Sequence, residues 1–169
     1  LIEEALELAA QIAETVEAAH SKLVIHRDLK PGNIMISTEG RVKVLDFGLA
    51  RVSTPKSSLL DRPENLESPT LAWQGSIHSP TIAGTIMGSA GYMSPEQVRG
   101  EDLDKRSDIF AFGCLLYEIL SGKKTFWAST LPDILAATLK SEPDLNELPS
   151  QRPLEIRRLV LRCLVKDKK

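Results

Sequence analysis

The sequence has no apolar run long enough to cross a bilayer, no marked excess of either charge and only two cysteines. Its 21 basic and 23 acidic residues give a formal net charge of −2, so neither nucleic acid nor an anionic membrane is expected as the main partner. No signal peptide is recognisable. Cys114 and Cys163 lack metal-ligand spacing, which predicts buried, reduced thiols in a cytoplasmic protein.

The pattern of apolar residues predicts a mostly helical domain with one small hairpin. Helical spacing of Leu6, Ala9, Ala13, Val16 and His20 indicates an amphipathic helix over residues 2–20. Two short apolar segments, 34–36 and 42–45, flank a turn-rich stretch at 37–40. They predict an antiparallel hairpin whose two ends carry polar residues.

The second half of the chain predicts three more helices. Ser107 or Asp108 is a candidate cap for an almost wholly apolar, buried helix that Gly122 ends. Thr130 is expected to open a shorter helix, and Pro153 a last one. Between the hairpin and these helices, residues 52–86 are rich in Ser, Thr and Pro, a composition that predicts a mobile surface loop.

Two polar segments carry the chemistry. Residues 26–33 read His-Arg-Asp-Leu-Lys-Pro-Gly-Asn, and residues 46–48, at the far end of the hairpin, read Asp-Phe-Gly. They offer two carboxylates, an ammonium and a side-chain amide. Transfer of a phosphoryl group from Mg-ATP to a hydroxyl needs such groups: one to orient the attacking oxygen, a cation for the moving charge, and oxygen ligands for the metal.

These segments resemble the catalytic loop and the metal-binding loop of serine/threonine protein kinases. Residues 88–96 resemble the end of a kinase activation segment, and residues 108–113 the start of the central helix of the kinase large lobe. The four motifs occur in the family's order over almost the whole chain. The resemblance is greatest to the bacterial branch, and it implies a protein-kinase-like α+β fold of which this chain is the mainly α-helical C-terminal lobe.

The resemblance implies a role for each matching residue. Asp28 would accept or orient the proton of the substrate hydroxyl, and Lys30 would place positive charge against the transferring phosphoryl group. Asn33 and Asp46 would hold Mg²⁺, and Met35 would lie beneath the adenine of ATP. The implied cofactors are thus ATP and Mg²⁺.

Other matching residues would support this site. His26 and Phe47 would pack together to set the orientation of the metal-binding loop, which Gly48 completes. Lys30 together with the hydroxyl of Ser89, which would help to link Asp28 and Lys30, favours a serine or threonine of a protein as the substrate. Further structural roles fall to Glu96 and Asp108.

Regulation is expected at Arg27, which precedes the catalytic aspartate. A phosphate on the activation segment carries about −1.5 to −2 charge and could tether that segment to Arg27. Thr85, four residues before Ser89, is the first candidate for this phosphate, and Thr81 is the second.

The resemblance also implies boundaries: a catalytic loop at 26–33, an activation segment at 46–96 and a helical subdomain at 97–169. The glycine-rich loop, the strand lysine and its partner glutamate of an N-terminal lobe do not occur in these residues. We therefore expect the chain to need that lobe as a partner, and to bind Mg-ATP poorly alone. Glu96 would normally pair with an arginine just beyond Asp167, and Arg162 is a possible substitute.

Two other functions remain open from the sequence. A small-molecule phosphotransferase of related fold shares an Asp-to-Asn catalytic loop and a later metal-binding aspartate, but it lacks an activation segment that ends in Pro-Glu, as at Pro95-Glu96. A non-catalytic pseudokinase or scaffold lobe is the second alternative. Retention of the four polar residues argues against it: Asp28, Lys30, Asn33 and Asp46.

Overall fold

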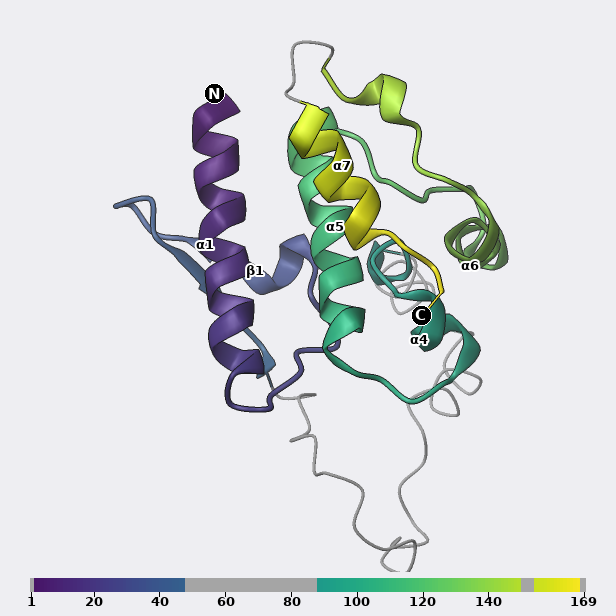
Figure 1. The fold of residues 1–169 in the computed structure, drawn as a ribbon, viewed down its shortest axis with the longest axis horizontal. Helices are drawn as coiled ribbons and strands as arrows, with labels where there is room; N and C mark the ends of the chain where they lie inside the picture. The colour runs from purple at the N-terminus through teal and green to yellow at the C-terminus, as the bar shows by residue number, and fades with distance from the viewer. Residues whose placement is uncertain (1, 48–87, 150–153, 168–169) are drawn as a thin grey trace, which may run out of the picture.

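The computed structural model describes residues 2–47, 88–149 and 154–167 (Figure 1). These residues form mainly helices, with one hairpin near the N-terminus. The elements are α1 (Ile2–His20), η1 (Pro31–Asn33), β1 (Ile34–Ile36), β2 (Val42–Val44), α4 (Pro95–Arg99), α5 (Lys105–Ser121), α6 (Leu131–Lys140), η3 (Leu145–Glu147) and α7 (Leu154–Cys163). The expected loop over residues 52–86 lies outside the described residues.

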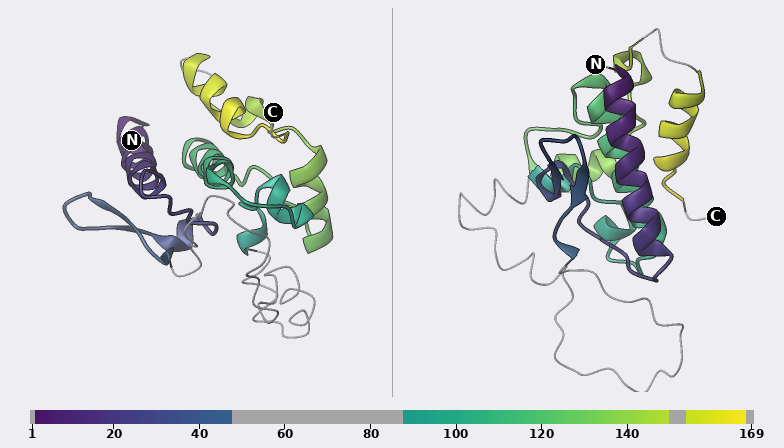
Figure 2. Two further views of the ribbon diagram at one scale, coloured as in Figure 1. Left: turned by 60° about the horizontal axis from the view of Figure 1, so that its bottom comes forward. Right: turned by 90° about the vertical axis from the view of Figure 1, so that its left-hand side faces the viewer.

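Helix α5 is the centre of the fold. Figures 1 and 2 show it between α1 and α7, and both helices pack against it. Gly113 allows the close approach of α7, because a Cβ there would lie 2.6 Å from the Cβ of Cys163. The buried core is drawn from α1, α5 and α7 and from the segments that join them; its largest fully buried apolar side chains include Ile12, Leu29, Phe110, Leu115, Leu116, Phe126, Ile134, Leu148 and Val160.

The predicted start of α5 is wrong, whereas its end is confirmed. Asp104 is the N-cap, where its carboxylate accepts the backbone N–H of Arg106, and the helix begins at Lys105. Ser107 and Asp108 are instead buried within the first turns, where their side chains bind other segments. The helix ends at Gly122, whose φ of 71° lies in the left-handed region that favours glycine.

The hairpin forms as predicted, with β1 and β2 antiparallel and Ile34 opposite Val44. The side-chain amide of Gln11, on α1, binds the hairpin through both of its polar atoms. Its Oε1 accepts the N–H of Val42, and its Nε2 donates to the carbonyl of Gly40. Because β1 follows directly on η1, the hairpin fixes the end of segment 26–33 relative to α1.

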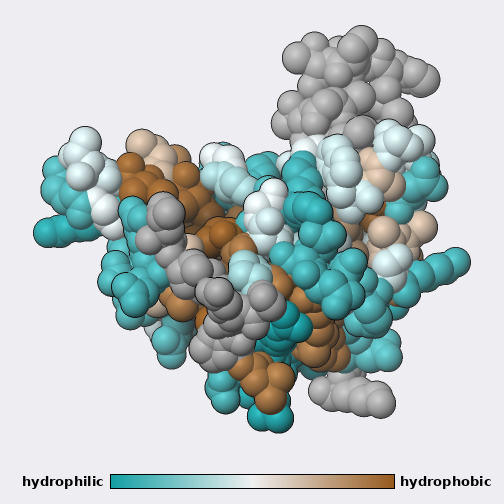
Figure 3. Space-filling model, turned by 90° about the horizontal axis from the view of Figure 1, so that it is seen from above, coloured by the Kyte–Doolittle hydropathy of each residue, from teal (hydrophilic) through white to brown (hydrophobic). Residues whose placement is uncertain are grey.

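Helices α1 and α6 agree with their sequence signals, α4 was not predicted, and the expected start of α7 at Pro153 lies outside the described residues. Thr130 caps α6, which has proline in its first turn, and residues 2–20 form α1 as predicted. On α7, Val160 and Cys163 are buried against α5 while Leu154, Leu159 and Leu161 are exposed. Apolar patches alternate with hydrophilic ones on the face in Figure 3. Among the described residues, no helix is both long enough and apolar enough to span a membrane.

Candidate active site

Lys30 joins the two halves of the candidate site. Its Nζ lies 2.7 Å from Asp28 Oδ2 and donates to Ser89 Oγ at 2.9 Å. Asp28 and Lys30 belong to the segment after α1, whereas Ser89 lies 59 residues further along, beyond the undescribed stretch 48–87. The side chains of Asp28 and Lys30 are each about a quarter exposed. A carboxylate and an ammonium are thereby held together at the surface, within reach of a ligand.

Asn33 orients Asp28 from the other side. Its Nδ2 donates to the backbone carbonyl of Asp28 at 2.7 Å and to Asp28 Oδ2 at 3.2 Å. Asn33 is buried in η1, whose proline at the first position begins the turn. Both bonds use the amide nitrogen, so the amide oxygen is the atom that Asn33 can offer to a metal ion.

Asp46 is brought near Asn33 by the hairpin. The N–H of Leu45 donates to the carbonyl of Asn33 at 2.7 Å, which extends the β1–β2 pairing by one residue. Asp46 follows with φ of 65° and is exposed. No three His, Cys, Asp or Glu side chains cluster as a metal site in the described part of the chain. Mg²⁺, however, is usually held by one or two protein oxygen ligands with water and phosphate oxygens, so Asn33 and Asp46 fit it.

Asp108 holds the backbone at the start of segment 26–33. Its Oδ2 accepts the N–H of His26 and its Oδ1 accepts the N–H of Arg27, both at 2.8 Å. His20 Nε2, at the end of α1, lies 2.7 Å from the same Oδ2. Asp108 is 1% exposed. A buried carboxylate on α5 therefore ties the end of α1 to the loop that carries Asp28.

His26 connects segment 26–33 to Asp46. The ring is fully buried, its Nδ1 accepts the N–H of Asp28 at 3.3 Å, and its Nε2 lies 2.8 Å from the carbonyl of Leu45. These partners place the ring proton on Nε2, which donates to that carbonyl. The ring also packs edge-on against Phe47, with centroids 4.6 Å apart. His26, itself part of segment 26–33, thus contacts the residues on either side of Asp46.

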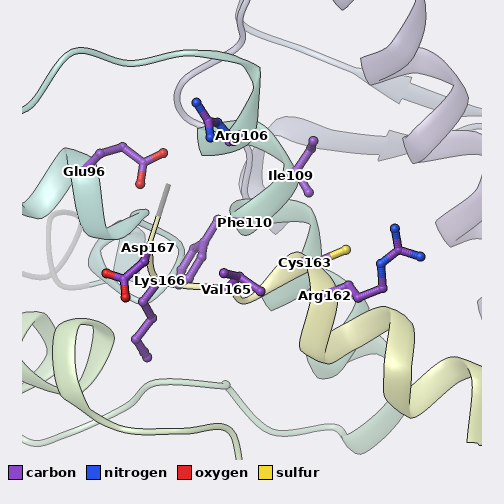
Figure 4. Close-up of a pocket in the computed structure, with 9 residues that line it drawn as sticks. All are labelled: Glu96, Arg106, Ile109, Phe110, Arg162, Cys163, Val165, Lys166 and Asp167. Atoms are coloured by element: carbon purple, nitrogen blue, oxygen red, sulfur yellow. The ribbon is translucent and has the colours of Figure 1, made fainter. Parts of the chain in front are cut away.

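The chain after Ser89 is anchored on α5. Tyr92 donates its hydroxyl hydrogen to Glu118, and burial raises the pKa of Tyr92. Glu96, on α4, is 5% exposed and accepts from Ser107 Oγ at 2.7 Å. It lines a cavity of about 160 Å³ with residues of α5, of the end of α7 and of the segment that follows α7 (Figure 4).

The predicted substitute partner of Glu96 is not found. Arg162 lines the same cavity, but Figure 4 shows the two side chains at opposite sides of it. Among the described residues no cation lies within ion-pair distance of Glu96. Within the part of the chain that the structure describes, the buried carboxylate of Glu96 has the hydroxyl of Ser107 as its hydrogen-bond partner.

Three predicted site residues lie outside the described residues: Gly48, Thr81 and Thr85. Met35 is on β1 and 55% exposed.

Sequence reasoning missed His20 as a partner of the site, although a histidine on an otherwise apolar stripe at the end of α1 was a visible signal. It also missed the bond between Tyr92 and Glu118, because no local pattern indicates a pair 26 residues apart.

Comparison with known proteins agrees with this arrangement. The family model described as the protein kinase domain matches residues 2–169. The chain is 33% identical over 169 residues to serine/threonine-protein kinase PknB of Mycobacterium leprae, which covers 98% of this chain and 23% of the relative. It is 36% identical over 167 residues to PknB of Mycolicibacterium smegmatis, covering 96% of this chain and 23% of the relative.

A third relative is a probable serine/threonine-protein kinase of Streptomyces coelicolor. It is 34% identical over 169 residues, which cover 99% of this chain and 22% of the relative. The chain thus spans less than a quarter of the length of these curated relatives.

Proposed function

The chain belongs to the protein kinase family, and from this premise we propose that it is the C-terminal lobe of a serine/threonine protein kinase. It would transfer the γ-phosphate of ATP to serine or threonine hydroxyls of proteins. The observation that carries the proposal is the bridge formed by Lys30, whose ammonium contacts both Asp28 and the hydroxyl of Ser89. The family and the names of its relatives favour a protein kinase over a small-molecule phosphotransferase.

Each side chain of the bridge has a chemical task in this proposal. Asp28, fixed by Lys30 and Asn33, accepts a hydrogen bond from the substrate hydroxyl and orients its oxygen for attack. Lys30 keeps a positive charge beside the path of the phosphoryl group. Asn33 and Asp46 would hold Mg²⁺, whose charge would offset that of the phosphates of ATP. Catalysis of this kind depends on positioning, which the bonds around Asp28 provide.

We further propose that the domain is completed by an N-terminal lobe over β1. Met35 on β1 is 55% exposed, an apolar side chain suited to an adenine ring and to a covering lobe. Ile36 is 54% exposed as well, and as the next residue of the strand it points to the opposite face of the hairpin. Residues 26–33, 46–96 and 97–169 would then be the catalytic loop, the activation segment and the helical subdomain. The 169-residue chain alone is expected to transfer little phosphate.

The experiment is a transfer assay with γ-labelled ATP, Mg²⁺ and a general protein substrate. It uses the chain joined to its N-terminal lobe, followed by identification of the labelled amino acid. Label on serine and threonine, dependent on Mg²⁺ and lost in Asp46→Asn, is the expected result. A folded protein that transfers no label to any substrate would support the non-catalytic scaffold alternative. Transfer of label to a small molecule only would support the small-molecule phosphotransferase alternative.

Control by phosphorylation remains a prediction for Thr85 and Thr81. Phosphopeptide mapping of the active protein is expected to find phosphate on one of them, Thr85 first. Active protein with both threonines unmodified would contradict this role.

A further inference from the structure

The peptide group that precedes Asp28 is held at both of its polar atoms. Its carbonyl, which belongs to Arg27, accepts from Gln97 Nε2 at 2.6 Å. Its N–H, which belongs to Asp28, donates to His26 Nδ1 at 3.3 Å. Arg27 itself has φ of 71°, a left-handed conformation that a residue with a side chain adopts only when its surroundings impose it.

Gln97 reaches this carbonyl from α4, at the other end of the activation segment. The two residues are 70 positions apart. The amide oxygen of the same side chain accepts the backbone N–H of Ser94 at 2.9 Å, as part of the capping box that begins α4. With the oxygen engaged as acceptor on Ser94 and the nitrogen as donor to Arg27, the orientation of the amide is determined.

Capping α4 does not by itself require glutamine. Glutamate at the third helical position serves a capping box equally well, because only an acceptor is needed there. The bond to the Arg27 carbonyl, in contrast, needs an N–H donor, which glutamine has and glutamate lacks. Glutamine at position 97 can therefore accept the N–H of Ser94 and donate to the carbonyl of Arg27 at the same time.

From this geometry we propose that Gln97 is a positioning residue. It fixes the peptide before Asp28 and so links the end of the activation segment to the catalytic loop. Asp108 holds the N–H of Arg27 from α5, and Gln97 holds its carbonyl from α4. A shift of α4 is therefore transmitted to the backbone that carries Asp28. The effect on turnover rests on the proposed kinase function, whereas the effect on the backbone does not.

The test is Gln97→Glu, which keeps the acceptor for Ser94 and removes the donor to Arg27. Ser94→Ala is the matched control, because it removes the Ser94 hydroxyl from the capping box but leaves the amide of Gln97 in place. Hydrogen exchange of peptides that cover residues 25–30 is measured by mass spectrometry, with peptides of α5 as the internal reference. We expect exchange to rise about 5-fold or more in Gln97→Glu at residues 25–30 alone.

Kinetics on the domain joined to its N-terminal lobe provide the second readout. We expect kcat to fall about 10- to 100-fold in Gln97→Glu because Asp28 is displaced slightly, with KM for ATP unchanged, and Ser94→Ala to stay close to the parent. If Gln97→Glu does not fold, Gln97→Met, of similar length and without polar atoms at its end, replaces it. Because methionine also lacks the acceptor for the N–H of Ser94, exchange is then expected to rise at α4 as well as at residues 25–30, with the same fall in kcat.

Unchanged exchange at residues 25–30 would overturn the proposal, and so would a rise shared equally by α5, which would indicate a general loss of stability. Local exchange that rises while kcat stays at the parent value would also overturn it. If the parent shows no turnover at all, the proposed function fails, but exchange still decides whether Gln97 fixes this peptide.

Discussion

Asp108 and Glu96 are both buried carboxylates, on neighbouring helices, and they are supported very differently. Asp108 has three partners, the backbone N–H groups of His26 and Arg27 and the ring of His20. The carboxylate of Glu96 has a single described hydrogen bond, from Ser107, and borders a cavity. A buried charge is costly unless donors surround it, so the two sites should respond to the same chemical change by different amounts.

This difference in hydrogen bonding distinguishes the surroundings of the two carboxylates. Around Asp108 the described residues hold the backbone N–H groups of His26 and Arg27, directly before Asp28. Around Glu96, between α4 and the segment after α7, the described residues leave a cavity and a carboxylate with little support. Among the described residues, the carboxylate of Asp108 therefore has more hydrogen-bond partners than that of Glu96.

The largest effect is expected from Asp108→Asn. The amide keeps one acceptor but places an N–H₂ group among three donors, so we expect the free energy of unfolding to fall by about 3 kcal/mol. Urea unfolding followed by circular dichroism measures this loss. A loss below that of Glu96→Gln would contradict the difference between the two carboxylates.

Ser107→Ala is expected to have an intermediate effect. It removes the hydroxyl that donates to Glu96 and leaves a buried carboxylate without that bond, at a cost of about 2 kcal/mol. The same substitution in a Glu96→Gln background should cost less, and the double-mutant cycle gives the coupling. Equal costs in the two backgrounds would show that Ser107 does not stabilise the charge of Glu96.

Glu96→Gln should change stability by about 1 kcal/mol or less, because the amide still accepts from Ser107 and no cation is left unpaired among the described residues. The same urea titration applies. A loss of 3 kcal/mol or more would mean that Glu96 has a strong cationic partner.

The smallest expected effect is a difference between the alkylation rates of the two thiols, which is measured on the parent protein without any change in its stability. Burial raises the pKa of Cys114 to about 12 and also raises that of Cys163. Cys163 lines the cavity beside Glu96, whereas Cys114 is 1% exposed on α5. At pH 8 both thiols should react slowly with iodoacetamide. Cys163 should react about 10-fold faster than Cys114. Peptide mass spectrometry gives both rates, and faster labelling of Cys114 would contradict the placement of the cavity.

The raised pKa values also set the dependence of stability on alkaline pH. A thiol whose pKa is higher in the folded than in the unfolded state favours folding at low pH, and this contribution is lost as pH rises through the folded pKa. For Cys114 the window runs from about 9 to about 12. Cys114→Ala should therefore show less destabilisation than the parent over this range in urea titrations, and an identical loss in both would contradict the assignment.

Local signals predicted the elements well. Thr130 and Gly122 mark helix ends, and the apolar runs on either side of residues 37–40 mark the hairpin. The start of α5 was misplaced because Ser107 and Asp108, good caps by type, are used for long-range bonds, while Asp104 caps the helix.

The site was only partly predictable. The family motifs indicated Asp28, Lys30 and Asn33, and the structure brings these three together. The bonds from Gln97 to Arg27 and from His20 to Asp108 span 70 and 88 residues. Such pairs are fixed by how the helices pack and leave no periodic signal in the sequence.

The most direct test of the account is the rate of the transfer step in Asp28→Asn. It is measured by rapid quench at saturating Mg-ATP, on the domain joined to its N-terminal lobe. If Asp28 orients the substrate hydroxyl, this rate falls by about 10²- to 10⁴-fold while the protein remains folded and its KM for ATP changes little. A transfer rate in Asp28→Asn equal to that of the parent would contradict the account.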